Sequence, residues 1–562
     1  MAKLDGKILK VDNTSPMGGG SFVLRELTIM SPSSPAVVHL NSPGLFEELN
    51  IYEDLFSNVL RGTFTFVDNQ GLAELIPIIG DETLILSFST PGAASKLETQ
   101  EVHGEQYFKS GSGSEEVFEQ VFRVYDCIED TTGEKSKYYK LFFVSQEYIV
   151  STKSKISKGY NGRFYHQIVK DALKKINKKI NPQWQKKVFI EKTGTPQNVI
   201  VPNWTPFQAI NFCASRSLSS SEEDTEIESS ENNQVPFAPG SLFVFYEKLG
   251  TGFFYESIES MIINQSTIKK LPRYQYLPKA AGGNNISMEF FGVDKFEFKS
   301  SFKTLVNLGF GMYGSKLIAY DPIRMKYDEI KYDYYKKDDK PTTETLDKKT
   351  GATTIETDPT QAKDDSQRIF ADFIATDIHP TERTQNKLIS ETSDLLDSND
   401  AAIHLATTTK DHDSMFVPPP IPNPADINAG IPVVANTHIG VSGKTFKDRY
   451  AKPNKIENWL LQREMQLQEF GNIVISFSVA GNSARHVGDL IKFEVPTSMA
   501  PDEMGSVELG HQLYSGYYIV SKIRHIITPT EYKTDLELIK NSFAKRIPGQ
   551  KTKENIGTGE QT

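Results

Sequence analysis

Cysteine is nearly absent from this chain. Only Cys127 and Cys213 occur among 562 residues, far apart in the sequence and each within an apolar stretch. A disulfide framework needs several cysteines, and a thiolate zinc site needs closely spaced ones. The sequence therefore excludes both kinds of site, and we expect two buried free thiols.

Long apolar runs and an excess of positive charge are also missing. No run of about 18 apolar residues occurs, so no membrane-spanning helix is expected. The first residues, MAKLDGKILKVDN, lack the apolar core of a secretion signal, which predicts synthesis in a cytoplasm. With 72 acidic against 62 basic residues, the net charge is −10. That balance argues against a protein that coats nucleic acid, although DNA can slide through an acidic channel.

Common catalytic and ligand-binding motifs are absent or incomplete. Neither G-x-S-x-G nor H-E-x-x-H occurs. The segment 440–445 (GVSGKT) resembles a phosphate-binding loop, but His438 stands where that motif needs glycine, so we interpret it as a turn. The histidines are scattered, and only His404 with residues 411–413 approaches a ligand cluster. We expect no catalytic residue, no bound metal and no cofactor.

Two groups of charged residues could have a functional role instead of simply facing solvent. The acidic pairs at 53–54 and 81–82 are of the residue type that glycosidases use across a cleft. Because both pairs lie at turns beside expected strands, we interpret them as solvated. The lysines of residues 170–187 are likewise expected on a solvated helix face rather than on DNA.

Alternating apolar residues indicate strands through most of the first 150 residues, as in 62–68 (GTFTFVD). A helical period follows over 163–180. A second helix begins near Thr205, which suits the N-cap, with Pro206 at the first helical position and Gln208 completing a capping box. A further helix is expected over 454–470, followed by strands.

The chain is too long for one core, so several folding units are expected. The predicted fold class is β-rich α+β, with two related antiparallel β-barrel domains, an α/β middle domain and a long insertion. The predicted boundaries are 1–150 for the first barrel, 151–235 for a helical or mixed domain, 236–335 for a mixed β domain, 336–453 for an insertion rich in Thr, Asp, Lys and Pro, 454–545 for a helix and the second barrel, and 546–562 for a polar tail.

The last strand-rich region repeats the pattern of the first. A Gly-Asp turn at Gly80 and Asp81 leads into an alternating strand, as another does at Gly488 and Asp489. Each turn follows one strand and precedes a return through a tyrosine-rich strand. A general likeness between any two β-meanders is the alternative to a duplication.

Several stretches, in order along the chain, resemble the central baseplate hub proteins of contractile-tailed, T4-like phages, which are related to the hub portion of VgrG spikes. They are 50–56 (NIYEDLF), 62–68 (GTFTFVD), 78–82 (IIGDE), 201–210 (VPNWTPFQAI), 311–317 (GMYGSKL), 480–482 (AGN), 488–491 (GDLI), 513–519 (LYSGYYI) and Arg524 with His525. The resemblance covers most of the chain outside the insertion. It depends on all of these stretches occurring in the family's order and not on any one of them.

The resemblance implies a non-enzymatic structural protein of the virion tail. It implies a homotrimer whose two tube-type domains form a pseudo-hexameric ring, with the tail tube protein above, the central spike below and baseplate wedges around it. That ring adapts a six-fold tube to a three-fold spike and leaves a channel through which DNA or tape-measure protein passes during genome ejection. Assembly in the host cytoplasm and no membrane partner are expected.

Two other functions remain open at this point: a tail-associated peptidoglycan-degrading enzyme, and the equivalent hub of a tailocin or other injection system. The residues to which we assign structural or interface roles are Trp204, Gly80, Asp81, Gly488, Asp489, Arg524 and His525.

Overall fold

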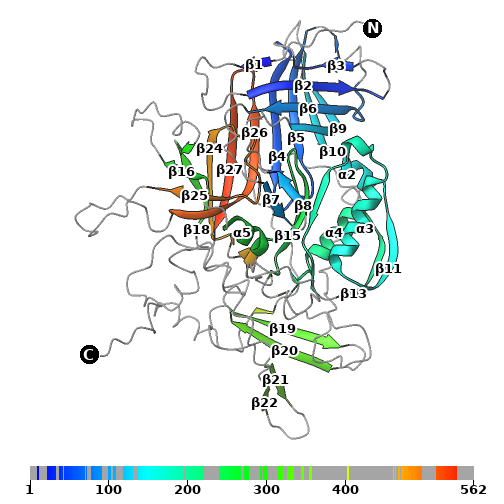
Figure 1. Cartoon of the computed structure of the whole chain (residues 1–562), viewed down its shortest axis with the longest axis vertical. Coiled ribbons are helices and arrows are strands. Elements are labelled where there is room, and N and C mark those ends of the chain that lie inside the picture. Colours follow the sequence, from blue (N-terminus) through cyan, green and yellow to red (C-terminus); the bar gives the residue numbers. More distant parts are fainter. Residues whose placement is uncertain are drawn as a thin grey trace, which may run out of the picture.

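The computed structural model is dominated by antiparallel β-sheet, with few helices, which confirms the β-rich prediction (Figure 1). The residues that the structure describes are 9–11, 22–32, 34, 37–41, 44–69, 71–72, 78–90, 99–102, 105–108, 118–130, 137–194, 196–220, 240–266, 271–276, 291–293, 295–301, 314–321, 326–333, 343–346, 353–356, 402–403, 460, 463, 466–468, 470–495 and 514–540.

Five strands form what we call unit one. They are β4 (Phe46–Asp54), β5 (Arg61–Asp68), β6 (Thr83–Ser89), β9 (Phe118–Asp130) and β10 (Lys137–Ser145). They are hydrogen-bonded in the order β6–β9–β10–β5–β4, antiparallel throughout. Beyond β6 the sheet continues through β2 (Phe22–Met30), which also pairs with β1 (Leu9–Val11) and β3 (Val37–His39).

Five later strands form unit two, and they repeat that arrangement. They are β18 (Phe296–Ser301), β24 (Ile473–Ala480), β25 (Leu490–Glu494), β26 (Gly516–Ile527) and β27 (Tyr532–Lys540). Their order is β25–β26–β27–β24–β18, again antiparallel throughout. Taken in chain order, each strand of unit two has the same neighbours as its counterpart in unit one. The strands flanking the two units differ, because β16 (Arg273–Tyr276) is parallel to β25 whereas β2 is antiparallel to β6.

The repeat extends to the irregularities of the strands. The carbonyl of Glu82 accepts from the amide of Val124 at 2.9 Å, and the carbonyl of Asp489 accepts from the amide of Val520 at 3.0 Å. Each valine is followed by a bulge, at Tyr125 in β9 and at Ser521 in β26. Because a bulge interrupts the ladder at one defined position, its recurrence fixes the alignment of the units. A general likeness of β-meanders does not account for it.

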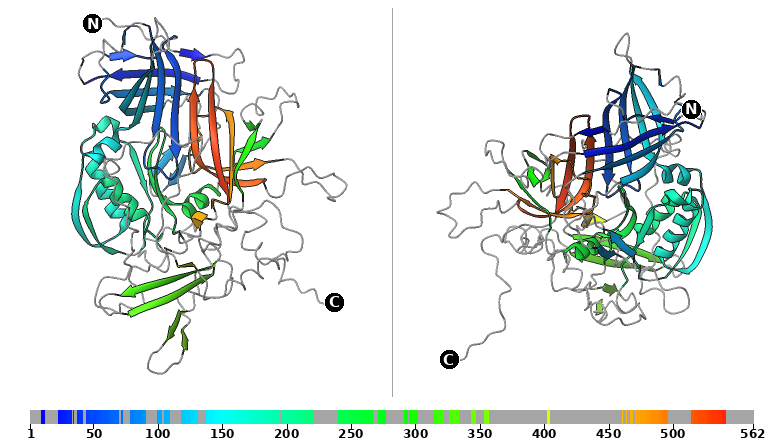
Figure 2. Two further views of the ribbon diagram at one scale, coloured as in Figure 1. Left: turned by 180° about the vertical axis from the view of Figure 1, so that it is seen from behind. Right: turned by 45° about the horizontal axis from the view of Figure 1, so that its top comes forward.

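The two units are not separate domains in the sheet. β4 of unit one pairs with residues 522–527 of β26, so one 15-stranded sheet runs through both units. Figures 1 and 2 show these strands, blue and red, side by side from each direction. No closed barrel is present among the described strands. The sequence prediction of two related β-barrel domains did not include this pairing, because it joins segments more than 460 residues apart.

A smaller layer packs beside unit one (Figure 1). Helices α2 (Gln146–Thr152), α3 (Tyr165–Asn177) and α4 (Pro206–Ala214) pack with the hairpin of β11 (Ile156–Arg163) and β13 (Gln197–Trp204). The predicted capping box at α4 is confirmed, since Thr205 Oγ1 accepts from the amide of Gln208 and the Gln208 side chain accepts from the amide of Thr205. The predicted helix over 163–180 is shorter, and Ile168, Leu173 and Ile176 line its buried face.

A three-stranded sheet connects these parts. β14 (Phe243–Lys248) pairs with β15 (Gly252–Ser257) as a hairpin, and β12 (Lys187–Ile190) is parallel to β15. The remaining elements are the short helix η1 (Pro182–Trp184), α5 (Ile258–Ser266), β17 (Gly292–Val293), the pair β7 (Thr99–Val102) and β8 (Glu105–Phe108), and the sheet of β19 (Gly314–Asp321), β20 (Lys326–Asp333), β21 (Thr343–Leu346), β22 (Thr353–Glu356) and β23 (Ala402–Ile403).

Several predictions fall wholly or partly outside the described residues. The segment 440–445, His404 with residues 411–413, most of the insertion and the tail 546–562 are among them. Of the helix expected over 454–470, Leu460, Arg463, residues 466–468 and Phe470 are described, and all of these are helical. No helix in the described part of the chain is long and apolar enough to cross a membrane.

Candidate functional site

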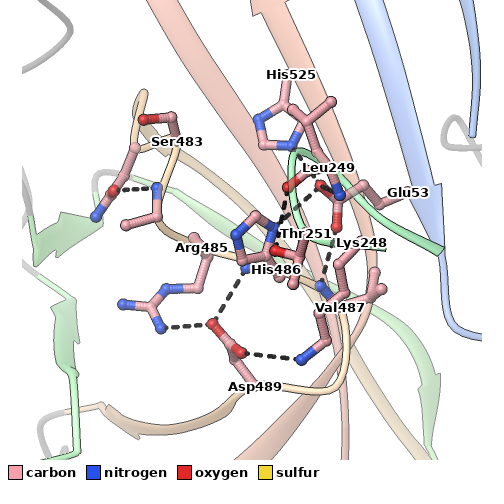
Figure 3. A network of polar contacts seen from close by, with 12 residues as sticks. Glu53, Lys248, Leu249, Thr251, Ser483, Arg485, His486, Val487, Asp489 and His525 are labelled. Carbon is pink, nitrogen blue, oxygen red and sulfur yellow. Dashed lines mark hydrogen bonds and ion pairs between the residues drawn. The ribbon is translucent and has the colours of Figure 1, made fainter. Parts of the chain in front are cut away.

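The candidate site is the buried polar contact between the units, which we call the seam (Figure 3). At its centre is Glu53, near the end of β4, with a side chain that is 0% exposed. Its carboxylate lies 3.3 Å from both His486 Nδ1 and His525 Nε2. It also accepts from the backbone amides of Leu249 at 3.2 Å and Val487 at 3.3 Å. One side chain of unit one thus contacts β26, the loop before β25 and the β14–β15 hairpin.

Asp489 forms the second half of the seam. Its carboxylate accepts from Arg485 Nη1 at 3.0 Å and from the amide of His486 at 3.1 Å, and it lies 3.8 Å from Lys248 Nζ. Arg485 also donates to Tyr274 Oη at 3.3 Å. The side chains of Asp489 and Lys248 are nearly fully buried. Because buried charges are stable only when paired, these contacts fix the loop before β25 against the hairpin.

The hairpin also contacts the other side of unit one through Glu247. This carboxylate accepts from the amide of Leu60 at 3.1 Å, Gln120 Nε2 at 2.8 Å and Ser145 Oγ at 2.7 Å. Lys186 Nζ forms an ion pair with Glu247 and a second one, at 2.7 Å, with Glu147. Three consecutive hairpin residues, 247–249, therefore join unit one, unit two and the helical layer.

The electrostatics of the seam follow from burial and pairing. Burial alone raises the pKa of Glu53, but the neighbouring His486 and His525 outweigh it and hold that pKa well below its usual value. Burial favours the neutral form of Lys186, but the carboxylates of Glu147 and Glu247 raise its pKa. Burial raises the pKa of Glu147. The carboxylate of Glu53 and the ammonium group of Lys186 are thus held charged in the interior by their partners.

The two predicted glycine turns occupy equivalent positions in the two units, but their acidic side chains make different contacts. Gly80 and Gly488 both have left-handed backbones, with φ of +86° and +79°. The structure aligns Asp489 with Glu82 rather than with Asp81, because the turn of unit one is one residue longer. Asp81 is exposed and lies 3.9 Å from Arg123. Glu82 is buried and accepts from the amides of Ile79 and Gly80, at 2.6 and 2.9 Å.

The other predicted residues lie in two places. His525 is fully buried in the seam, where Nδ1 lies 2.8 Å from Tyr532 Oη. Arg524, next to it on β26, donates from Nε to Asn50 Oδ1 at 3.0 Å. Trp204 lies in the helical layer, half-buried at the end of β13 with its ring centroid 5.0 Å from that of Phe212.

The structure corrects two predictions of solvated charge. Glu53 and Glu82 are buried, whereas the acidic pairs were expected in solvent. Lys186 is nearly buried and lies beyond the end of α3, although it was expected on a solvated helix face. For Glu53 a signal was present, because Leu49, Ile51 and Glu53 alternate and share the inward face of β4. Nothing in the local sequence marks Glu247 or Lys186, whose partners come from distant segments.

The geometry allows few chemical roles. Among the described residues, no group of three or more His, Cys, Asp or Glu side chains is arranged to hold a metal ion. Both cysteines are free, but the expectation of two buried thiols is correct only for Cys213, because Cys127 is half-buried. Burial raises the pKa of the Cys127 thiol to about 11, so this thiol is a poor nucleophile at neutral pH. The seam is built to hold parts of the chain together.

No family model and no curated protein matches the chain. Solved structures similar to it include a 43 kDa prophage tail protein from Shewanella oneidensis (TM-score 0.40, 9% identity, covering 92% of this chain and 98% of that one) and a tail protein from Neisseria meningitidis (0.41, 8%, 92% and 97%). Another is the Escherichia coli c3393 protein, a component of the type VI secretion system (0.33, 8%, 93% and 80%).

Proposed function

We propose that this chain is the structural central hub protein of a contractile-tail baseplate. Three copies form a pseudo-hexameric ring that adapts a six-fold tail tube to a three-fold spike. The observation that carries this proposal is the duplication of the five-stranded unit, down to the bulges at Tyr125 and Ser521. The ordered set of hub-like stretches in the sequence supports it independently.

The duplication matters because of symmetry. A ring of three identical chains has three-fold symmetry, and two similar units in each chain give such a ring six similar surfaces. One face can then match a six-fold partner while the rest of the chain, which is not duplicated, matches a three-fold one. In this proposal the units are tube-type barrel domains around a channel for DNA or tape-measure protein. The tail tube protein, the spike and the baseplate wedges are the neighbours in the virion.

The seam suits an adaptor that has to keep its two units in fixed relation. Six backbone pairs join β4 to β26. Glu53, Asp489 and Glu247 add buried charged contacts that need defined geometry. Buried networks of this kind favour one arrangement over others, because a shift leaves a charge unpaired. Units held in this way present their outer surfaces at a constant angle.

The peptidoglycan-degrading alternative loses its best candidates. A glycosidase needs two carboxyl groups facing across a substrate cleft. In the pairs that the sequence offered, Glu53 is enclosed by His486 and His525, and Glu82 by its own turn. Neither glutamate has access to a substrate, and the exposed Asp81 is left without an accessible carboxyl group beside it in its pair. We therefore propose a non-enzymatic role.

Light scattering on the purified full chain tests this proposal. We expect three chains per particle, and electron-microscope class averages with a ring of three- or six-fold appearance. A monomer that persists at high protein concentration would overturn the proposal. Zymography on cell walls provides a second test, because clearing that is lost on replacing one carboxylate would establish the enzymatic alternative.

A further inference from the structure

The duplication also predicts how one copy meets the next, because the two units expose different parts of equivalent strands. Within the chain, the outer edge of β4 is covered by residues 522–527 of β26. The counterpart of β4 is β18, which has β24 as its only partner among the described strands. The counterpart of residues 522–526 is 126–130 of β9, which pair with β10 on one edge and with no described strand on the other. Each half of the intrachain junction thus has an uncovered counterpart.

We propose that these two uncovered edges pair between copies, so that residues 126–130 of one chain add to β18 of the next. The inference rests on the proposed trimer and names its interface. An open edge carries unpaired backbone donors and acceptors and readily takes another strand. The occupant is a second copy because the same pairing already exists inside the chain. In a trimer, intrachain and interchain junctions then alternate around the ring.

Exposure supports this assignment. Ile523 and His525 on β26 are buried at the intrachain junction. Their counterparts on β9, Cys127 and Glu129, are half-buried and exposed. Ile128 between them is 50% exposed, so its side chain is accessible to a strand from a second copy. The edge of β9 therefore resembles a junction strand from which the partner is missing.

The register follows from the bulge alignment. With Tyr125 equivalent to Ser521, Glu129 and Asp130 correspond to His525 and Ile526, which lie opposite Ile51 and Asn50. The counterparts of Ile51 and Asn50 on β18 are Phe298 and Glu297. The transferred register thus places Glu129 opposite Phe298, and Asp130 opposite Glu297. Two carboxylates directly opposite each other weaken a strand pair, and charged residues on an edge also prevent unwanted pairing, so the register itself has to be tested.

Disulfide trapping tests the register. Asp130→Cys and Glu297→Cys are introduced together into the full chain, with Cys127→Ser to remove the adjacent thiol. Directly opposite residues in antiparallel strands lie about 4.5–5.5 Å apart at Cα, within the range of a disulfide. We expect mild oxidation to give covalent species of up to three chains on non-reducing gels, and reduction to remove them. The chain series ends at three because the ring closes.

The matched control replaces Lys295, an exposed residue two positions before Glu297, in place of Glu297. A two-residue offset moves the thiols beyond disulfide reach, so we expect about tenfold less cross-linking. Light scattering on each reduced variant separates the two proposals. A trimer with no cross-link above the control overturns the edge pairing and leaves the hub function standing. A monomer overturns the hub function. A cross-link within a single chain also contradicts the edge pairing.

Discussion

Units one and two share a backbone plan but use their turns differently. In unit one the buried carboxylate of Glu82 accepts from amides of its own turn. In unit two the equivalent Asp489 also accepts from an amide of its own turn, that of His486, but in addition it contacts Arg485 and lies near Lys248 of a distant hairpin. The strand order and the bulge are therefore the repeated part, and the polar side chains at the turn are specialised. The contact between the units thus depends on polar side chains that differ between them, whereas the backbone hydrogen-bonding pattern is the same in both.

Among substitutions at the contact between the units, we expect the largest loss of stability from Glu53→Ala. Removing this carboxylate leaves two backbone amides and the imidazoles of His486 and His525 without their shared acceptor. Breaking a buried charged contact costs about 3–5 kcal/mol. We expect a loss of that size in the free energy of unfolding, measured by urea denaturation. Glu47→Ala, an exposed position on the same strand, should change it by less than about 0.5 kcal/mol. Equal effects would show that the seam is not held by Glu53.

The two turn glycines offer a direct comparison of the units. Both φ values are positive, so alanine at either position costs about 1–2 kcal/mol in backbone strain. At Gly488 an added Cβ also meets Met261 Sδ at 2.8 Å and Tyr246 Oη at 3.1 Å, whereas at Gly80 the nearest atom is the Tyr125 carbonyl oxygen at 3.4 Å. Gly488→Ala should therefore destabilise by about 1 kcal/mol more than Gly80→Ala. Thermal unfolding measures this difference, and the reverse order would contradict the packing described here.

Acid should weaken the contacts of Glu53 in the seam. Because the pKa of Glu53 is lowered in the folded chain, its contribution to stability is complete above the ordinary glutamate pKa of about 4.3 and is lost as pH falls below it. Burial raises the pKa of Glu147, which acts in the opposite direction, so the readout is a difference between variants. We expect Glu53→Gln to have a lower free energy of unfolding than the unsubstituted chain near pH 7. The difference between the two should become smaller as the pH falls. A gap independent of pH would exclude ionised Glu53 as the cause.

Much of the fold could be predicted because it is encoded locally. Alternation identified strands such as β5, and residue types at set spacing identified the capping box of α4. The recurrence of a Gly-Asp turn before a strand, at residues 80–81 and 488–489, indicated the repeat. The one-residue difference between the turns could not be predicted, since it is seen in the hydrogen bonds of Glu82 and Asp489 and in the strand registers that follow them.

The seam itself could be predicted only in part. His525 and Asp489 were singled out by resemblance, but Glu53 was placed in solvent because an acidic residue near a turn is usually exposed. Its partners come from residues 249, 486, 487 and 525, which the sequence gives no means of bringing together. The pairing of β4 with β26 is equally non-local. Its register depends on contacts between segments that lie far apart in the sequence.

The smallest changes in stability are expected from substitutions of Arg524 on β26 and of its counterpart on β9, Ile128. Arg524 donates to Asn50 and lies 3.5 Å from Glu48, both of which lie on β4, so Arg524→Ala should cost about 1 kcal/mol of folding stability. Ile128 is exposed in the single chain, so Ile128→Ala should change the stability of a dilute monomer by less than about 0.5 kcal/mol. If residues 126–130 pair with a second copy, Ile128→Ala should still weaken trimer formation, seen by light scattering across a dilution series. A loss of monomer stability as large as that of Arg524→Ala would mean that Ile128 is covered within its own chain, and the proposed difference between the two edges would be wrong.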